Sequence, residues 1–393
     1  MHDILYLAWR YLVFHRLKTI ILVTSIMLIV YLPTGLNAVI KQSAEHLTAR
    51  AEQTPLLVGA NGSPLELTLN SLYFSSDYPQ LIDYAEAISV MDSGLADAIP
   101  LYVRFRSRSH PIVGTSLDYF SYHDLKFSSG RPMAVLGECV LGAAVAESLG
   151  AQPGDSVISS TETVFDLAGV YPLKMTVAGV LERAFTPDDD AIFVDVKTAW
   201  VIEGLGHGHQ DLARPDAASS VLSRSEEIIV ANASVVQFNE ITRENLDSFH
   251  FHGDLASYPL TAVLAVPRND KSGVILRGRY MNDNARSQII RPLLVIEELL
   301  ETVLTIQQFI VAAVIIVGSA TVATAALVFL LSLKLRRLEI DTMHKIGGSR
   351  IRVASILMAE VFIVVILSGV LAVVMNMITW RFGPGVIESF VLA

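Results

Sequence analysis

The sequence predicts a membrane protein in which an α-helical transmembrane bundle carries one large, water-exposed α+β domain. The chain of 393 residues is 52% hydrophobic and only 17% charged, whereas soluble domains are about 25% charged. Charges are missing from three stretches, Thr19–Ile40, Thr302–Leu333 and Val361–Trp380. Between the first two stretches the composition is that of an ordinary globular domain. The deficit of charge is therefore local and marks segments that enter a membrane.

Each uncharged stretch is long enough to cross a bilayer as a helix, which takes about 20 apolar residues. We expect transmembrane helices over residues 19–40, 302–333 and 353–380. The first stretch follows a long leader without a clear cleavage site, so we interpret it as a span and not as a signal peptide. Glu360 is expected near the cytoplasmic edge of the third span, because an acid at the bilayer centre costs several kcal/mol. It would pair with a basic loop residue or a hydroxyl of the second span, or reach the interface without a partner.

Basic residues in the short loops predict the orientation. They gather in residues 1–18 and 334–352, which we place in the cytoplasm. Residues 41–301 and the tail 381–393 then lie outside. Residues 19–300 carry 19 basic and 33 acidic residues, a formal charge of −14, which argues against a nucleic-acid role. The simplest interpretation of this charge is solubility of the outer domain, and the alternative is a surface that collects cations.

Two helical stalks are expected to flank the outer domain. Residues 41–54 are polar helix formers that continue the first span, and residues 284–308 form a second approach helix that begins or bends at Pro292. Between them we expect strands and short helices, including a helix over 140–149 and an exposed loop over 204–220. The acids Asp188–Asp190 are interpreted as a solvated turn.

The sequence contains none of the motifs that would make it an enzyme. A nucleotide-binding G-x-x-x-x-G-K-[ST] loop, H-E-x-x-H, C-x-x-C and G-x-S-x-G are all absent. The single cysteine, Cys139, cannot form an internal disulfide. We therefore expect no catalytic residues and no cofactor in this chain.

Two His-x-His pairs are candidate metal ligands, because residues two apart on a strand share a face. We place the candidate site at His207, His209 and Asp211, where neighbouring glycines let the chain bend around one ion. The second pair, His250 and His252, is too far along the chain to complete a compact zinc finger. The alternative is that both pairs are solvated or structural histidines.

Small residues in the second span predict helix packing, because they let helix backbones approach closely in lipid. The residues are Gly318, Ser319, Ala323 and Ala326. Their partner would be a second permease copy or a neighbouring span, and the alternative is a helix that faces only lipid.

Two parts of the sequence resemble known transporter subunits. Motifs in order from Val113-Gly-Thr-Ser to Asp190-Ala-Ile-Phe-Val resemble the periplasmic core domain of MacB-type ABC transporter permeases. The segment Leu338–Arg350 followed by Ile351–Glu360 resembles the FtsX-like permease signature. Those families usually have four spans, whereas three are predicted here, so this chain is either a three-span variant or lacks the last helix.

The resemblance implies a permease subunit in the bacterial inner membrane, with its large domain in the periplasm or outside. ATP and Mg²⁺ would bind to a separate ABC ATPase subunit, and two permeases would pair in a homo- or heterodimer among the membrane lipids. ATP hydrolysis would move the outer domains through the stalks, and this movement would serve export or the handling of lipoproteins or peptides. A periplasmic or outer-membrane protein would be a further partner. Three alternatives stay open: an FtsX-like regulator of an extracytoplasmic partner without transport, a non-transport sensor that shares only the outer fold, and a metal-linked transporter.

The cytoplasmic loop 334–352 is the expected ATPase contact. It alternates apolar and charged residues and predicts a short amphipathic helix that ends at two glycines. The alternative is a plain basic loop that only sets topology. The candidate coupling residues are Leu338, Ile340, Met343, Ile346, Gly347, Gly348 and Arg350.

Overall fold

The computed structural model describes residues 2–75, 77–160, 172–208, 221–224, 229–231, 239–281, 286–345 and 349–391. The chain divides into two compact units. We call Met1–Leu47 with Glu298–Val391 the membrane unit, and Thr48–Glu297 the outer unit.

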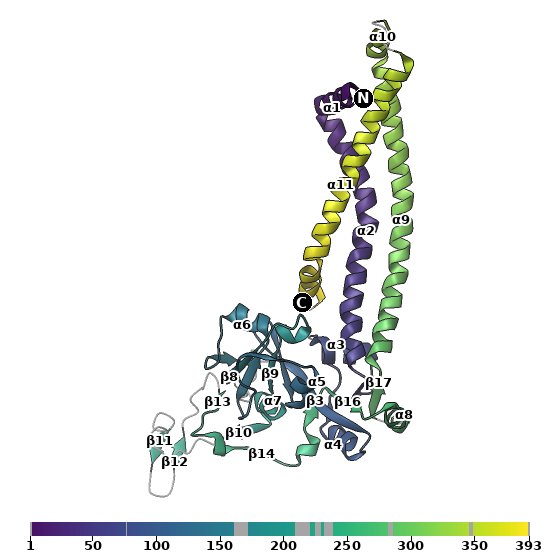
Figure 1. The fold of residues 1–393 in the computed structure, drawn as a ribbon. Helices are drawn as coiled ribbons and strands as arrows, with labels where there is room; N and C mark the ends of the chain where they lie inside the picture. Colours follow the sequence, from purple (N-terminus) through teal and green to yellow (C-terminus); the bar gives the residue numbers. More distant parts are fainter. Residues whose placement is uncertain are drawn as a thin grey trace. The chain divides into compact units, whose positions relative to one another are not determined.

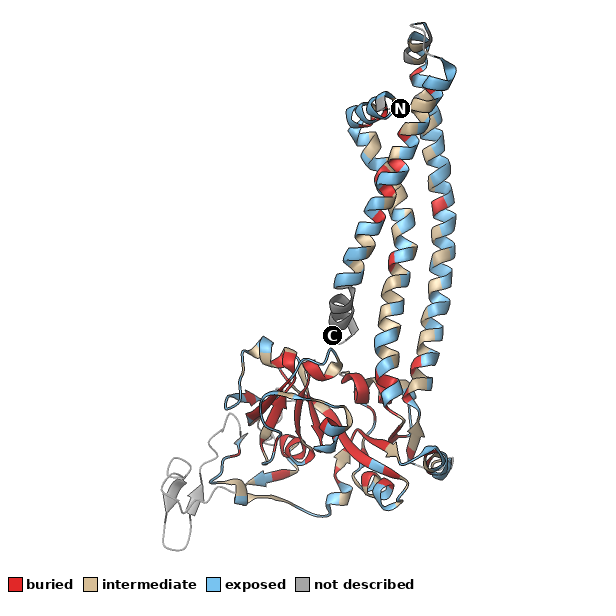
Figure 2. Cartoon of the chain, in the orientation of Figure 1, coloured by how far each residue is buried: buried red, intermediate tan, exposed pale blue. Residues whose placement is uncertain are grey.

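The membrane unit consists of helices. They are α1 (His2–Phe14), α2 (Arg16–Gln53), α9 (Pro292–Leu335), α10 (Arg337–Lys345) and α11 (Arg350–Val391), of which α2 and α9 extend into the outer unit. Among the described residues, three helical stretches are long and apolar enough to cross a membrane: Arg16–Gln53, Pro292–Leu335 and Arg350–Arg381. The long helices are mostly exposed (Figure 2), as expected of surfaces that face lipid.

In the part of the chain that the structure describes, the outer unit is built on one mixed sheet of 11 strands, several of which are labelled in Figure 1. The main path runs β13-β8-β6-β9-β4-β3-β16-β1-β17, and β5 and β7 also pair with β8. Pairs β4–β9, β6–β8 and β8–β13 are parallel and the others are antiparallel. The strands are β1 (Leu56–Ala60), β3 (Ala96–Ser107), β4 (His110–Thr115), β5 (Phe127–Gly130), β6 (Glu138–Leu141), β7 (Ser156–Ile158), β8 (Leu173–Leu181), β9 (Ile192–Asp195), β13 (Asn239–Glu240), β16 (Ala262–Pro267) and β17 (Ser287–Ile290).

Three two-stranded ribbons and several short helices complete the outer unit. The ribbons pair β2 (Ile82–Asp83) with β15 (Pro259–Leu260), β10 (Gly206–Gly208) with β14 (Phe249–Phe251), and β11 (Val221–Arg224) with β12 (Ile229–Ala231). The helices are α3 (Pro64–Tyr73), α4 (Ala85–Asp92), α5 (Asp118–Tyr122), α6 (Ala143–Leu149), α7 (Val196–Ile202) and α8 (Asp270–Arg279), with 3₁₀ turns η1 (Pro187–Asp190), η3 (Leu246–Ser248) and η4 (Leu255–Ser257).

Alternation along the strands gives the sheet two apolar faces, because successive side chains point to opposite sides. On β3, Leu101 and Val103 belong to one buried cluster, whereas Tyr102 belongs to the other. Phe105 joins the cluster of Tyr102 because the register shifts between Val103 and Arg106. The first cluster includes side chains of α3 and α5, and the second those of α4, α6, α7 and α8. Helices therefore cover both faces. A helical membrane unit with an α+β domain confirms the predicted fold class.

The structure corrects three local expectations. Val140 and Leu141 are part of strand β6, held between β8 and β9, so the helix begins only at Ala143. Residues 287–290 form β17 on the sheet edge and are not part of the second approach helix. That helix, α9, begins at Pro292, one of the two possibilities expected, because proline favours the first position of a helix. Gly206–Gly208 forms strand β10 and is not loop, because it pairs with a segment some 40 residues further on.

Candidate functional site

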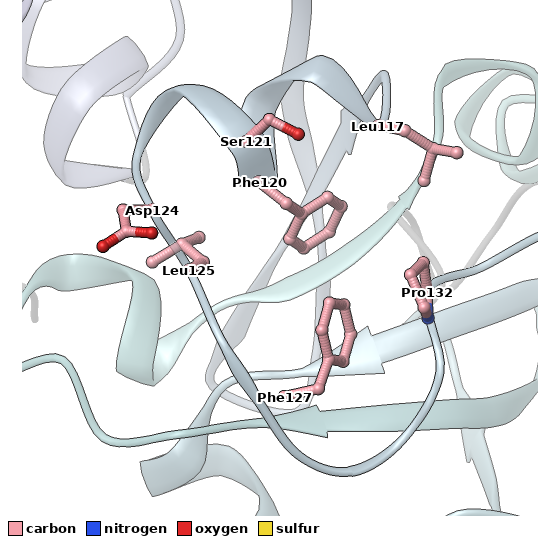
Figure 3. A pocket seen from close by; sticks show the side chains of 7 residues that line it. All are labelled: Leu117, Phe120, Ser121, Asp124, Leu125, Phe127 and Pro132. Carbon is pink, nitrogen blue, oxygen red and sulfur yellow. The ribbon is translucent and has the colours of Figure 1, made fainter.

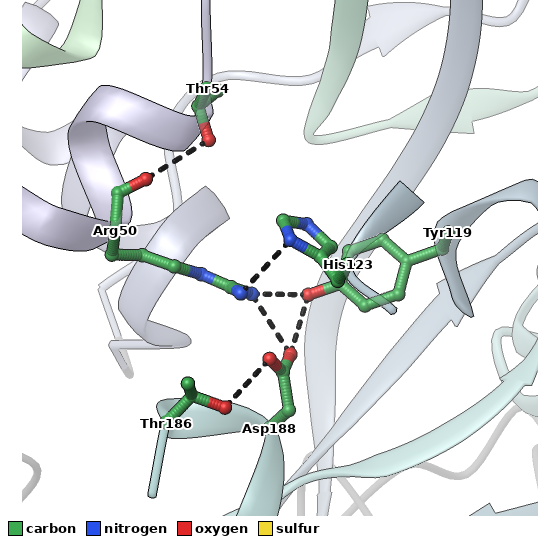
Figure 4. A network of polar contacts seen from close by, with 6 residues as sticks. All are labelled: Arg50, Thr54, Tyr119, His123, Thr186 and Asp188. Atoms are coloured by element: carbon green, nitrogen blue, oxygen red, sulfur yellow. Dashed lines mark hydrogen bonds and ion pairs between the residues drawn. The ribbon is translucent and has the colours of Figure 1, made fainter. Parts of the chain in front are cut away.

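The end of α2 is fastened inside the outer unit by a buried polar network (Figure 4). Arg50, in the last turn of α2, is only 5% exposed. One guanidinium nitrogen donates to Asp188 Oδ1 at 2.9 Å and to the Tyr119 hydroxyl at 2.6 Å. The other lies 3.2 Å from His123 Nδ1. Tyr119 in turn donates to Asp188 Oδ1 at 2.6 Å, and the Thr186 hydroxyl donates to Oδ2 at 2.9 Å.

The Asp188–Asp190 triplet is therefore not the solvated turn that we expected. Asp188 and Asp189 are 1% and 7% exposed. The Asp189 carboxylate accepts from the backbone N–H groups of Ala184 and Phe185 at 2.9 and 2.8 Å. A Cβ on Gly142 would lie within 2.4 Å of the carbonyls of η1, so the glycine allows this close approach. Asp188 and Asp189 can be buried because a distant arginine satisfies the charge of the first and local N–H groups satisfy that of the second.

The electrostatics of the network follow from burial and from the Arg50 charge. Burial alone would raise the pKa of Asp188, but the Arg50 charge and the hydroxyl donors hold that pKa below its usual range. Burial raises the pKa of Tyr119, so the hydroxyl keeps its proton and donates a hydrogen bond to Asp188. Burial and the Arg50 charge lower the pKa of His123 to about 3. His123 is therefore neutral and Nδ1 can accept from Arg50.

The low pKa of His123 predicts acid sensitivity of the outer unit. The unfolded imidazole, with a pKa near about 6.5, binds a proton that the folded one rejects down to about pH 3. The free energy of unfolding should therefore fall as pH drops below about 6.5, by at most about 1.4 kcal/mol per pH unit. The stabilising contribution of Asp188, whose pKa is lowered, is complete above about pH 4. The change in the free energy of unfolding between about pH 4 and pH 6.5 is therefore assigned to histidine.

Urea unfolding of the full chain at pH 7.0, 5.5 and 4.5 measures this effect. Trp200 is buried in the outer unit, so its fluorescence reports unfolding there once Trp9 and Trp380 are replaced by Phe. His123→Gln should flatten the pH dependence. An equally steep dependence in that variant would contradict the assignment.

Both connections to the membrane unit leave the outer unit from neighbouring strands. Helix α2 ends at Gln53, whose carbonyl accepts a hydrogen bond from the Tyr122 hydroxyl, and β1 begins at Leu56. Strand β17 ends at Ile290 and α9 begins at Pro292. Strands β1 and β17 pair in antiparallel register from Leu57 opposite Ile290 to Ala60 opposite Ser287. The two long helices are thus attached to adjacent strands at one edge of the sheet.

A hollow of about 330 Å³ lies beside the same region (Figure 3). Helix α5, which carries Tyr119 and Tyr122 toward the end of α2, contributes Phe120 and Ser121 to its lining. The rings of Phe120 and Phe127 meet there at 5.8 Å between centroids. The hollow is near the lower size limit of small-molecule pockets.

Comparison with known proteins identifies the family. The family model of the MacB-like periplasmic core domain matches residues 19–243 of the sequence, more than half of the chain. The chain belongs to this family. It is thus an ABC transporter permease of the MacB type, a membrane protein with an extracytoplasmic domain, as the sequence resemblance predicted.

Two solved structures are similar to part of this chain. The extracellular domain of the noncanonic ABC-type transporter YknZ from Gram-positive bacteria is 11% identical, with a TM-score of 0.32, covering 60% of this chain and 98% of that one. The periplasmic region of MacB from Actinobacillus actinomycetemcomitans is 11% identical, with a TM-score of 0.34, covering 63% and 92%. None of the curated proteins matches the sequence.

Glu360 of the permease forms a buried ion pair inside the membrane unit. Its two carboxylate oxygens lie 3.0 and 3.1 Å from Arg336, which stands between α9 and α10. Arg336 also stacks over the Tyr11 ring at 3.6 Å. Both charged residues are less than a tenth exposed. Helices α1 and α11 and the end of α9 are therefore joined by one polar contact, in which the partner of Glu360 is a basic residue of the loop.

The predicted coupling residues are only partly described. Helix α10 covers Leu338, Ile340 and Met343, and Arg350 begins α11. Leu338 is 82% exposed, whereas Ile340 and Met343 are half-buried. Ile346, Gly347 and Gly348 lie outside the described residues. The most accessible apolar side chain of α10 is therefore Leu338, on the side opposite Ile340.

The predicted small-residue stripe of α9 divides between two surroundings. Gly318 is buried, and a Cβ there would lie 3.1 Å from Ile29 of α2. Ser319, Ala323 and Ala326 are exposed. Gly318 thus packs within the chain, and the other three leave a small-residue surface uncovered.

The histidines come together differently from the predicted set. His207 lies opposite His250 in the β10–β14 ribbon, and a possible ligand atom of each of His207, His250 and His252 lies within 4.8 Å of the others. His209 and Asp211 lie outside the described residues.

Sequence reasoning missed Arg50, Tyr119 and Asp188 as a unit, and Arg336 as a specific partner. Nothing in the sequence around Arg50 or in the Pro-Asp-Asp-Asp turn that contains Asp188 indicates that these two residues form a pair.

Proposed function

We propose that this chain is the permease subunit of an ABC transporter that works by mechanotransmission. A separate ATPase subunit would bind ATP and Mg²⁺ and hydrolyse the nucleotide in the cytoplasm, and the permease itself would hold no cofactor and catalyse nothing. Helices α2 and α9 would carry the resulting movement to the extracytoplasmic domain. The setting is the bacterial inner membrane.

The attachment of the two helices carries this proposal. Because α2 and α9 join adjacent, hydrogen-bonded strands, a shift of one helix against the other acts directly on the β1–β17 pair. Because the last turn of α2 is held by the buried Arg50–Asp188 pair, movement of that helix would be passed to the domain core. A flexible tether would need neither feature.

ATP-driven movement of the outer domain tests the proposal. A spin label at Glu147→Cys, on an exposed side chain of α6, reports the distance between two copies in lipid nanodiscs that also hold the ATPase. Cys139 is fully buried and should stay unlabelled. We expect the distance distribution to shift between nucleotide-free and ATP-vanadate states. Steady ATP hydrolysis with an unchanged distribution would overturn the proposal.

The ATPase is expected to dock on α10 through Leu338. An aspartate in place of this exposed leucine should leave the fold intact and abolish co-purification of the ATPase, because it puts a charge into an apolar contact. Phe185→Asp is the control, since Phe185 is 76% exposed but lies in the outer unit. Recovery of the ATPase with Leu338→Asp at the level of the control would exclude this contact.

A second permease copy is expected against the exposed part of the small-residue stripe. Single cysteines at Ser319 or Ala323, in a Cys139→Ala background, should form a disulfide-linked dimer upon mild oxidation. Val317→Cys is the matched control, because Val317 is 64% exposed on the opposite side of α9. Equal cross-linking at all three positions would contradict a specific interface.

A further inference from the structure

Three histidines share one face of the β10–β14 ribbon. His207 on β10 pairs directly with His250 on β14. His252 follows His250 by two residues and so points to the same side of the chain. The three ring centroids lie 5.1, 5.0 and 4.6 Å apart in the His207–His250, His207–His252 and His250–His252 pairs.

The opposite face of the ribbon is anchored to the core. Phe249 and Phe251 lie across from Gly208 and Gly206, and their rings take the space that a Cβ at either glycine would need. Phe251 packs edge-on against Trp200 and Tyr258 at 6.4 and 5.9 Å between centroids. The aromatic face is thus held inward, and the imidazoles are turned outward.

Backbone hydrogen bonds orient the histidines further. His250 Nδ1 lies 2.9 Å from the Ser248 carbonyl, which can only accept, so Nδ1 carries the proton and Nε2 the lone pair. The Tyr258 hydroxyl donates to the His252 carbonyl at 2.9 Å. A carbonyl that fixes the tautomer of an imidazole is the usual support of a metal-ligating histidine.

We propose that His207, His250 and His252 bind one divalent transition-metal ion of the zinc class on the extracytoplasmic domain. Three imidazole nitrogens leave a fourth position for water or for a ligand from another molecule. Tetrahedral zinc needs its nitrogens about 3.4 Å apart, so atoms that lie within 4.8 Å of one another reach it by small side-chain rotations. His207 and His252 are exposed and His250 is half-buried, so an ion can enter from solvent.

This set differs from the loop site that the sequence indicated, and only His207 is common to both. Loss of zinc binding in His250→Ala or His252→Ala identifies the ribbon site, whereas loss in a combined His209→Ala and Asp211→Asn variant identifies the loop site. The ribbon variants change outward-facing side chains and leave Phe249 and Phe251 in place.

Zinc titration of the full, untagged chain in detergent at pH 7.5, in competition with a chromophoric chelator, decides the matter. We expect the parent chain to bind one zinc ion. His250→Ala and His252→Ala should each lower the zinc affinity by at least 10- to 100-fold, because removal of a group that only orients a metal ligand already has an effect of that size. Co²⁺ should give the intense visible bands of a tetrahedral complex in the parent chain and lose them in His250→Ala. The proposal is overturned if His250→Ala and His252→Ala bind zinc as the parent does, or if the loop variant alone loses it. Unchanged urea unfolding by Trp200 fluorescence shows that the variants are folded.

Discussion

Replacement of Arg50 by methionine is expected to lower the free energy of unfolding of the outer unit by about 3–5 kcal/mol. The variant keeps most of the apolar stem but leaves the Asp188 carboxylate, only 1% exposed, without its counter-charge. A buried charge that loses its partner costs more than the intact pair contributed. Urea unfolding followed by Trp200 fluorescence measures the change.

Two further variants separate charge from packing. Asp188→Asn in the Arg50→Met background removes the uncompensated charge and should recover part of the lost stability. Arg183→Met is the control, because its pair with Glu147 has side chains that are 42% and 72% exposed and should contribute only about 0–1 kcal/mol. If Arg50→Met costs no more than Arg183→Met, the network does not hold the domain.

The same double variant tests coupling. If the Arg50–Asp188 pair transmits the movement of α2, the folded double variant should still support ATP hydrolysis while the label distance at Glu147→Cys no longer responds to nucleotide. A normal response would remove the network from the mechanism but leave its role in stability. The two roles are therefore measured separately.

Replacement of Glu360 by alanine is expected to have a similarly large effect on the membrane unit. It leaves the Arg336 guanidinium, 9% exposed, with the Tyr11 ring but without its carboxylate. We expect the membrane unit to lose about 3–5 kcal/mol of stability. Size-exclusion chromatography after heating measures this loss as a lower temperature at which the purified chain no longer elutes as a single species. The swapped pair, Arg336→Glu with Glu360→Arg, should restore part of it.

Asp341→Ala is the control for this second prediction. Its ion pair with Lys345 lies within α10, and the side chains are 58% and 75% exposed. Solvent screens such a pair, so its loss should leave the transition within about 1 kcal/mol of the parent. If Glu360→Ala is as stable as Asp341→Ala, the buried pair does not join the helices.

Local features of the sequence were sufficient for most of the architecture. The apolar stretches that became the cores of α2, α9 and α11 are recognisable because a helix must present about 20 apolar residues to lipid. The alternation along Leu101–Arg106 indicates a strand because a period of two is a property of the strand itself, although the structure buries β3 on both faces. The domain motifs between Val113 and Val194 led to the family that the comparison confirmed.

Local features failed where the deciding partner is distant. Val140 and Leu141 resemble a helix start, but both neighbouring strands pair with them. Gly206–Gly208 has the composition of a loop, yet Phe249 and Phe251 fill the space above its glycines and make it a strand. In both cases pairing across the sheet overrides propensity.

The sequence by itself determined the long apolar helices and the presence of an α+β domain, because these depend on composition and periodicity within a single segment. Only the tertiary structure decided that Arg50 meets Asp188 across 138 residues, that Arg336 neutralises Glu360, and that His207 joins His250 and His252. The two ion pairs depend on which buried charges meet in the folded chain, and the histidine cluster depends on which strands pair. That choice is made by the whole fold, because a charge is stable in the interior only where a distant residue supplies its counterpart.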